Sequence, residues 1–464
     1  MKLKYRHIAL AILAATAISA GAQELRSGYF IDSYLYQHEL NPAFGNENDY
    51  FSMPFLGNFN SNMMGNFGYE ELVHKNPLYP DRSSKKMTSF LNPYLTNPLK
   101  GFGSGDNKIN ADLKVGIMSF GFKKWGGYNT IELNMRGNFN VKAPYKLFQF
   151  AVDATNKNYD IGDIAIDAQS FAELAVGHSR DINPDLRVGG KAKLLVGIAD
   201  ASVRMNDVVA DLKEADKWVI KADAQADVSM SGFKYLTKVK DYNAKDESFK
   251  KVNDMDFGIG VSGFGLAVDA GVVYKAMDDL TLSAAINDLG AIVWLNDYRA
   301  ANKAKSFEFN GFHDVSVNSD SEQKLDNQAD SYTDQMLDFA NLRDEGDKGV
   351  RITGIGATIN AGAEYVIPTY RALKLGVLAT MRVNGPHSWS EGRFSANIKP
   401  VNWFEGGINV AVNSYTANVG FIANFHSRKC NFFIGMDRIV GKVSKEFIPL
   451  NSNGSVSLGL NFNM

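Results

Sequence analysis

A strict alternation of apolar and polar side chains constrains this chain more than any other feature of its sequence. In "NTIELNMRGNFNVKA", residues 129–143, the odd positions from Ile131 onward are apolar or small, and the even positions from Thr130 onward are polar or charged. Successive side chains of a β-strand point to opposite faces, so this pattern predicts one strand with an oily face and a wet face. Its length is about twice that of a common strand.

The same pattern recurs along the chain, at residues 186–198, 218–230, 266–275, 373–383, 394–398, 408–412, 417–425 and 456–464. Short turn signals separate many of these segments, among them "NPD" at 183–185, "KAMDD" at 275–279 and "KKWGGYN" at 123–129. We count about fourteen strand candidates. Helical periodicity is absent between most of them, which favours antiparallel hairpins over a parallel sheet with crossover helices.

Two architectures bury alternate residues of many antiparallel strands. In a secreted sandwich the apolar face meets a second sheet, whereas in an outer-membrane barrel it meets lipid and the polar face lines the lumen. The better segments have the ten or so residues that a lipid-crossing strand needs, and the C-terminal "SVSLGLNFNM" is amphipathic. Cys430 is the only cysteine, so no disulfide within the chain can hold a sandwich together. We therefore predict an all-β fold, a transmembrane antiparallel β-barrel of about fourteen strands.

The alternation assigns side chains to the two faces of the barrel wall. The residues expected to face lipid are Ile131, Leu133, Met135, Phe139 and Val141. The residues expected to line the lumen are Glu132, Asn134, Arg136, Lys191, Lys193, Asp223 and Asp227. Several of the tryptophans lie near predicted strand ends, where an aromatic girdle at the membrane interfaces is expected in preference to ligand contacts: Trp218, Trp294, Trp389 and Trp403.

Segments without the alternation define the domain organisation. Residues 1–22 have the basic start, short apolar core and A-x-A site of a cleaved signal peptide. Residues 23–110 are rich in Asn, Pro, Gly and aromatics, and are expected to be ordered but irregular. The barrel is assigned to residues 111–464, with a long acidic loop at residues 300–350. Within that loop aspartates recur every four residues from 326 to 338, as they would along one face of a short helix.

Several of these stretches resemble a known group of sequences. "RSGYFIDSYLYQHELNPAF", "NADLKVGIMSFGFKKWGGYNTIELNMR", "LAVDAGVVYKAMDDLTLSAAINDLGAIVW" and the amphipathic C-terminus are similar to an uncharacterised Bacteroidota family of predicted outer-membrane barrels. That family is more remotely similar to the long-chain fatty-acid transporter class and to secretion-associated barrels. The resemblance implies about fourteen strands and an N-terminal segment that can plug the lumen. It implies no ligand site.

The sequence offers little support for chemistry. Lysine plus arginine (49) balances aspartate plus glutamate (51), and basic patches with aromatics are absent, so no nucleic acid partner is expected. "GIGVSG" at 258–263 is followed by an alternating strand and not by the helix that a dinucleotide loop requires. "HSWS" at 387–390 follows "NGP" and is typical of a hairpin loop more than of a hydrolase site. We predict no catalytic, cofactor-binding or metal-binding residues, and no enzyme.

The patterns favour a protein of the bacterial outer membrane, in contact with its lipid. The first hypothesis is a passive channel or transporter for a small solute, hydrophobic or polar. The alternative is a non-conducting structural or docking barrel for a secretion or surface-assembly system, with envelope protein partners bound through loop 300–350. Both remain open at this point, because a packed network of lumen charges and a conducting lumen have the same sequence signature.

Overall fold

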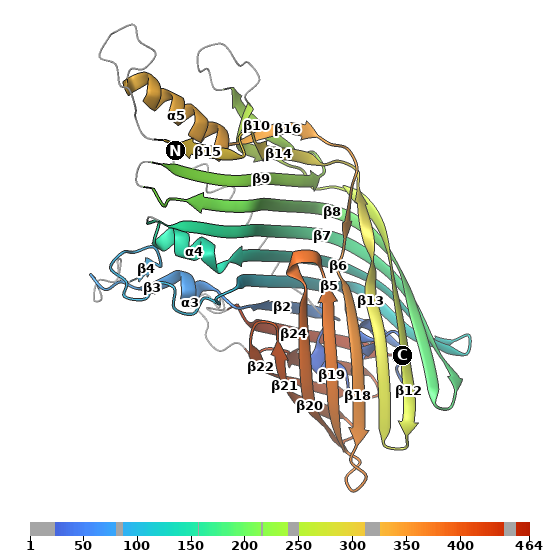
Figure 1. Cartoon of the computed structure of the whole chain (residues 1–464). Helices are drawn as coiled ribbons and strands as arrows, with labels where there is room; N and C mark the ends of the chain where they lie inside the picture. Colours follow the sequence, from blue (N-terminus) through green and yellow to red (C-terminus); the bar gives the residue numbers. More distant parts are fainter. Residues whose placement is uncertain are drawn as a thin grey trace.

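The computed structural model of the chain describes residues 24–79, 87–155, 157–214, 217–239, 250–310, 325–439 and 452–464. The predicted signal peptide at 1–22 lies outside these ranges, as do residues 311–324 of the predicted acidic loop. Within the described residues, 14 antiparallel strands close into a barrel, which confirms the predicted fold (Figure 1). No described helix is both long enough and apolar enough to cross a membrane.

The ring closes because a short strand pair from the N-terminal part fits between the first long strand and the last one. β1 and β2 share one place in the ring, and each pairs with both β24 and β5. In ring order the strands are β1 (Tyr50–Ser52) with β2 (Phe59–Gly65), β5 (Asp106–Lys124), β6 (Gly127–Pro144), β7 (Asn158–Asn183), β8 (Leu186–Asp211), β12 (Gly263–Met277), β13 (Leu280–Trp294), β18 (Ala357–Val366), β19 (Leu373–Val383), β20 (Trp389–Val401), β21 (Phe404–Asn413), β22 (Ala417–His426), β23 (Cys430–Met436) and β24 (Gly454–Asn463).

The outer face of the ring is apolar and uncovered. Leu266 on β12 and Ile408 on β21 are 70% and 67% exposed, and every ring strand from β12 to β22 exposes large apolar side chains in the same phase. A soluble monomer rarely exposes an apolar surface of this extent. Lipid covers such a belt in a transmembrane barrel.

Short hairpins gather at one end of the barrel, which we call the turn end, and longer connections gather at the other, the loop end. In the "KKWGGYN" turn, Trp125 and Gly126 have φ of 56° and 72°, as a tight two-residue hairpin requires. The "NPD" and "KAMDD" turns join β7 to β8 and β12 to β13, which confirms the predicted hairpins. In outer-membrane barrels short turns face the periplasm and long loops face the outside.

The wall is much taller on one side than on the other. β7 and β8 each have 26 residues, whereas β21 and β22 have 10. The part of β8 near the turn end, residues 186–197, pairs with β12. The part near the loop end, residues 199–211, pairs with β9, which is the first strand of a sheet extension beyond the loop end (Figure 1). The extension comprises β9 (Trp218–Met230), β10 (Lys234–Val239), β11 (Lys250–Asp256), β14 (Tyr298–Asn302), β15 (Ser306–Phe309), β16 (Leu342–Asp347) and helix α5 (Leu325–Ala340). β17 (Arg351–Gly354) instead pairs with the ring strand β13, as β18 does. α5 confirms the helix predicted from the aspartate spacing.

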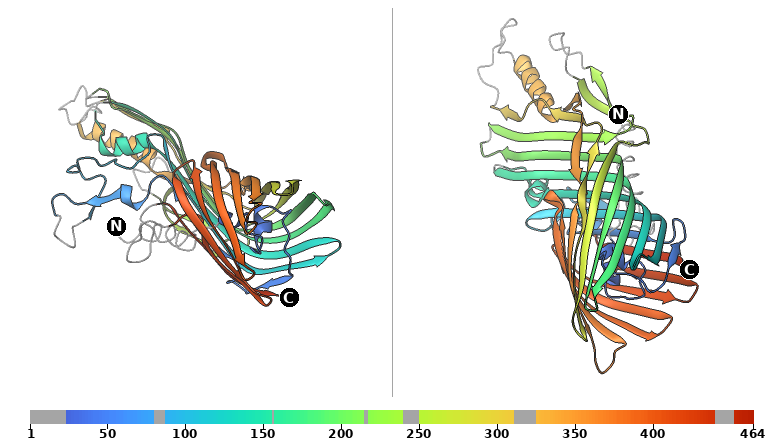
Figure 2. Two further views of the ribbon diagram at one scale, coloured as in Figure 1. Left: turned by 90° about the horizontal axis from the view of Figure 1, so that it is seen from below. Right: turned by 90° about the vertical axis from the view of Figure 1, so that its right-hand side faces the viewer.

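The predicted irregular N-terminal segment divides into three parts. Residues 24–48, which we call the plug, lie inside the barrel and contain η1 (Arg26–Gly28) and α2 (Gln37–Leu40). β1 and β2 join the ring, so the barrel begins before the predicted boundary at residue 111. Residues 66–79 and 87–105, together called the side segment, lie outside the wall with α4 (Tyr145–Val152) and contain α3 (Tyr69–Leu72), β3 (Val73–Lys75) and β4 (Met87–Ser89) (Figure 2).

Candidate functional site: a bore closed at two levels

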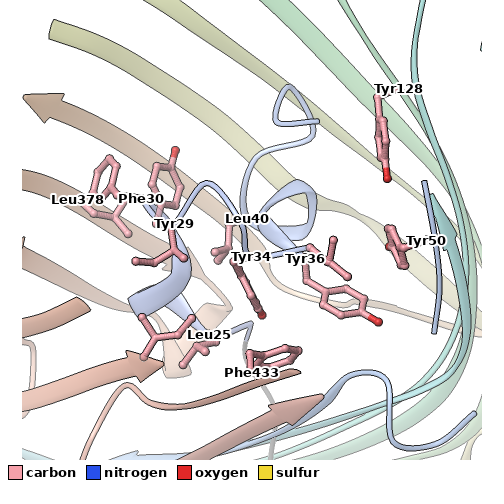
Figure 3. Close-up of a cluster of buried hydrophobic side chains, with 13 residues drawn as sticks. Leu25, Tyr29, Phe30, Tyr34, Tyr36, Leu40, Tyr50, Tyr128, Leu378 and Phe433 are labelled. Atoms are coloured by element: carbon pink, nitrogen blue, oxygen red, sulfur yellow. The ribbon is translucent and has the colours of Figure 1, made fainter. Parts of the chain in front are cut away.

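The plug fills the barrel with aromatic side chains. Tyr29 and Tyr34 are fully buried in a cluster that joins the plug to Tyr128, Leu378 and Phe433 of the wall (Figure 3). The rings of Tyr34 and Phe433 meet edge to face, with centroids 5.0 Å apart. The wall residues come from widely separated ring strands, so the plug contacts the wall around the bore. The aromatic-rich "YFIDSYLY" stretch is thus an interior packing element.

Only side chains hold the plug backbone to the wall. Among the described residues, the backbone-to-backbone hydrogen bonds of residues 24–48 all stay within the plug, for example Asn41 N to Gln37 O and Phe44 N to Asn41 O. Strand pairing with the wall begins only at Tyr50. Release of the plug therefore needs no sheet hydrogen bond to break.

One anchor of the plug is a buried group of acidic and basic side chains around α2. Lys114 of β5 lies 2.8 Å from Glu39 and 3.6 Å from Glu24, and Asn58 also donates to the Glu39 carboxyl. Burial raises the pKa of Glu39 to about 8, against the lowering effect of Lys114 and with a further rise from Glu132. Burial thus favours the protonated form of Glu39.

His38 extends this anchor as a neutral ring. Lys191 Nζ donates to Glu132 Oε2 at 2.6 Å and lies 2.8 Å from His38 Nδ1. Burial, followed by the charge of Lys191, lowers the pKa of His38 to about 3, so Nδ1 can accept from the lysine. The other ring nitrogen lies 3.0 Å from the hydroxyl of Tyr50. The predicted lumen residues Glu132 and Lys191 are thus buried partners of the plug.

A second anchor holds the start of the plug near the loop end. The backbone N–H groups of Arg26 and Ser27 donate to the carboxylate of Asp437 at 3.0 and 2.7 Å. The Arg26 guanidinium lies 3.2 Å from Glu391 and stacks over the ring of Trp389 at 4.8 Å. Charge-assisted bonds of this kind are stronger than neutral ones.

The remaining predicted lumen residues of the ring form a network within the wall. Arg136 makes a two-pronged contact with Asp288, 2.8 Å on each side, and also bonds Glu173. Lys193 lies 2.6 Å from Asp288, and Asn134 donates to Glu173 at 3.1 Å. All five side chains are buried inside the barrel. They are packed against one another.

Two predicted lumen residues lie on β9, outside the ring. Asp227 is buried and accepts from Arg299 at 2.7 Å. Asp223 is about half exposed and pairs with Lys305 of the extension, so its assignment to the lumen is wrong. The alternation gives the correct phase on β9 but cannot reveal that the strand leaves the barrel.

A second closure crosses the bore between the plug and the loop end. The β19–β20 connection, residues 384–388 with η2 (Gly385–His387), is here called the crossbar. Pro386 O accepts from Lys108 Nζ of β5 at 2.8 Å, and His387 Nε2 lies 2.6 Å from Asp167 of β7. Arg204 holds the same aspartate through two contacts of 2.8 Å.

The crossbar links opposite walls. β5 and the β19–β20 connection face each other across the ring, separated on one side by β6, β7, β8, β12, β13 and β18. Just below the crossbar, Arg382 of β19 comes within 4.0 Å of Asp112 of β5. His387 is buried, whereas Ser390 points outward next to Ser414, so the "HSWS" residues do not meet.

Most residues predicted to face lipid lie on the outer face of the barrel and are at least partly exposed. Ile131 is 38% exposed, and Leu133, Met135 and Phe139 are part-exposed in the same phase. Val141 instead packs against the cluster around Phe148 of α4, which corrects its assignment to lipid. The side segment covers the wall at that level.

A comparison with models of protein families shows to which family the chain belongs. The model of a family of unknown function, DUF5723, matches residues 42–437. The chain belongs to this family. The result agrees with the resemblance of the sequence to an uncharacterised family. A comparison of this DUF5723 member with curated proteins gave no match.

Several solved structures resemble this DUF5723 barrel distantly. The toluene transporter TbuX of Ralstonia pickettii is 8% identical with a TM-score of 0.40, and 91% of each chain is covered. The toluene transporter TodX of P. putida is 9% identical with a TM-score of 0.36, covering 91% of this chain and 90% of that one. A FadL homologue of Pseudomonas aeruginosa is 10% identical with a TM-score of 0.34, covering 96% and 94%. At these values the likeness carries no conclusion about this chain.

Sequence reasoning missed the inward tryptophans of this DUF5723 protein. Trp294 is fully buried among Phe171, Leu195 and Ile292, and its indole N–H donates to Thr353 at 2.7 Å. Trp389 is buried against Arg26 of the plug. Both were expected in an interfacial girdle. Their phase gave a usable signal, because Trp389 shares the inward phase of the charged Glu391 and Arg393.

Proposed function

We propose that this protein is an outer-membrane channel for small solutes, exported by its predicted signal peptide and closed at rest by the plug and the crossbar. The observation that carries the proposal is the attachment of the plug. A lipid-facing barrel contains a separate segment that is bound to the wall only through side chains. Wall side chains alone can fill a barrel of about eight strands, but not a ring of 14 strands, so the plug is the element that closes this bore.

The lining indicates the class of solute. Removal of the plug would leave Glu132, Lys191 and Lys114 facing the bore, and these side chains would then bind water. Such a lining favours small polar or amphipathic solutes over purely apolar ones. We therefore expect passage of ions and small hydrophilic molecules once the bore is open.

Planar-bilayer recording tests this function. The wild-type protein should be silent or open rarely. A variant with weakened closure at both levels, Asp437→Asn with His387→Ala, should show discrete openings. Each preparation is first checked on a detergent gel for the mobility of a folded barrel. A correctly folded double variant that seals as tightly as the wild type would contradict the channel.

A second candidate function is docking of an envelope protein, supported by the sheet extension. β14, β15, β16 and α5 rise beyond the ring at the loop end, and Lys303 of this extension pairs with Asp338 of α5 at 3.1 Å. Deleting residues 325–340 should abolish recovery of a partner after cross-linking in cells, and leave the barrel folded. Unchanged recovery would contradict docking through α5.

A further inference from the structure

The side segment packs against the outer face of the wall, at the loop end. Ile109 of β5 and Val141 of β6 are register partners in the outward phase, and both contact the cluster formed by Phe67, Phe102 and Phe148. The inward phase at the same level carries polar side chains. The side segment is therefore outside the barrel, where a membrane protein meets lipid or water.

Its height along the wall can be worked out from the strand. With a rise of about 3.4 Å per residue and a tilt near 40°, a barrel strand climbs about 2.6 Å per residue. The outward residues 131–139 of β6 then span about 21 Å, close to the ~25 Å apolar band of such barrels. Val141 lies about 5 Å higher, and the headgroup layer on each side of the hydrocarbon is about 5–7 Å thick. The side segment thus begins at headgroup depth.

The surface of the side segment is unusually apolar for a part of the protein that lies outside the hydrocarbon core of the membrane. Its exposed large apolar side chains are Tyr69, Leu78, Tyr79, Met87, Leu91 and Tyr94. In the described parts of residues 66–105 the exposed charged residues are Lys75 and Lys100, both basic. Tyrosine with aliphatic neighbours and lysine is the composition that membrane interfaces select.

We propose that the side segment is a membrane-interface platform that rests on the headgroups of the leaflet at the loop end. Its tyrosine and leucine side chains enter the boundary between headgroups and acyl chains, and its lysines contact anionic headgroups. The side segment lies beside the loop end of the tall wall (Figures 1 and 2). This inference depends on the membrane placement of the barrel and not on the proposed channel.

Site-specific fluorescence tests the platform in the full-length protein. Cys430→Ser removes the only cysteine, and an environment-sensitive dye is then attached to Leu91→Cys or Tyr94→Cys. Ile408→Cys in the apolar belt and Met336→Cys on α5, 67% and 53% exposed, are the matched lipid and water controls. The proteins are reconstituted into phosphatidylethanolamine–phosphatidylglycerol vesicles that carry a nitroxide either at the headgroup or deep in the acyl chain.

The headgroup nitroxide should quench the dyes at positions 91 and 94 at least about twofold more than the deep nitroxide, as expected for interfacial side chains. The order should be reversed at position 408, and quenching should be weak at position 336. Quenching at 91 and 94 as weak as at 336 would overturn the platform. So would blue-shifted emission at 91 and 94 without quenching by either lipid, because protein would then cover these positions.

Discussion

Substitution of Asp437 by Asn should loosen the plug more than any other single change of one carboxylate. The carboxylate accepts from the backbone of Arg26 and Ser27 at 3.0 and 2.7 Å, and from the Ser27 hydroxyl at 2.6 Å. An amide has no charge and offers one acceptor oxygen in place of two. The bond from Arg26 N to Oδ2 is lost, at about 1.5 kcal/mol, and the two Ser27 bonds to Oδ1 become neutral, at about 0.75 kcal/mol each, which gives about 3 kcal/mol in all. That corresponds to a roughly 100-fold larger population of released plug.

The release can be measured by labelling of a buried thiol. In the Cys430→Ser background, Ala43→Cys places a thiol at a fully buried position of the plug. When the plug closes faster than a polyethylene glycol maleimide reacts, the labelling rate follows the population of released plug. Asp437→Asn should therefore speed the labelling about 100-fold relative to the same background alone.

A matched substitution separates plug release from general loosening. Asp288 is equally buried, and its carboxylate contacts Arg136 and Lys193 of the wall. Asp288→Asn should change the labelling rate of the thiol at position 43 by less than about threefold, since these contacts lie within the wall. An Asp437→Asn effect below threefold, or an equal effect of Asp288→Asn, would refute the role of the second anchor.

The other predictions concern pH, lipid and the crossbar. Burial raises the pKa of Glu39 to about 8 in the docked plug, above its value of ~4.3 when exposed; docking is therefore strongest below that lower value and weakens as pH rises to 8. The labelling rate at position 43 is measured with Glu39 present and in the Glu39→Gln variant. The first rate divided by the second should increase between pH 5 and pH 8.5, and a constant ratio would contradict the raised pKa of Glu39. Leu133→Arg should cost about 2–4 kcal/mol in folding into lipid vesicles, and Trp125→Arg at the turn about 0–1; equal costs in urea titrations would mean that the belt is misplaced. His387→Ala should raise the conductance of single openings in the Asp437→Asn background, because the bond to Asp167 holds the crossbar over the bore; unchanged open-state conductance would exclude the crossbar from the conduction path.

The alternation of side chains was sufficient to predict the strands and their antiparallel pairing, because strand phase is a local property. The hairpin at Trp125 and Gly126 and the helix at residues 325–340 follow from equally local signals. The number of ring strands agrees with the predicted fourteen, although the members differ: β9 leaves the ring, and β1 with β2 of the N-terminal segment takes one place in it. Membership of the ring depends on pairing between distant residues, which strand phase does not contain.

The surroundings of each face could not be predicted in the same way. Asn134 is predicted to line a wet lumen, but it is fully buried against Glu173. Val141 shares the phase of Leu133 but meets the side segment. Both outcomes depend on which distant segment fills the bore or covers the wall, and side-chain period contains no information about that.

Membrane fractionation followed by a detergent gel, with and without boiling, tests the central claim most directly, namely that the chain is a closed barrel in lipid. The protein should be found in the outer-membrane fraction, and the unboiled sample should migrate differently from the boiled one, because a closed antiparallel barrel resists detergent until heated. Identical mobility of the two samples, with the protein free in the periplasmic extract, would contradict it.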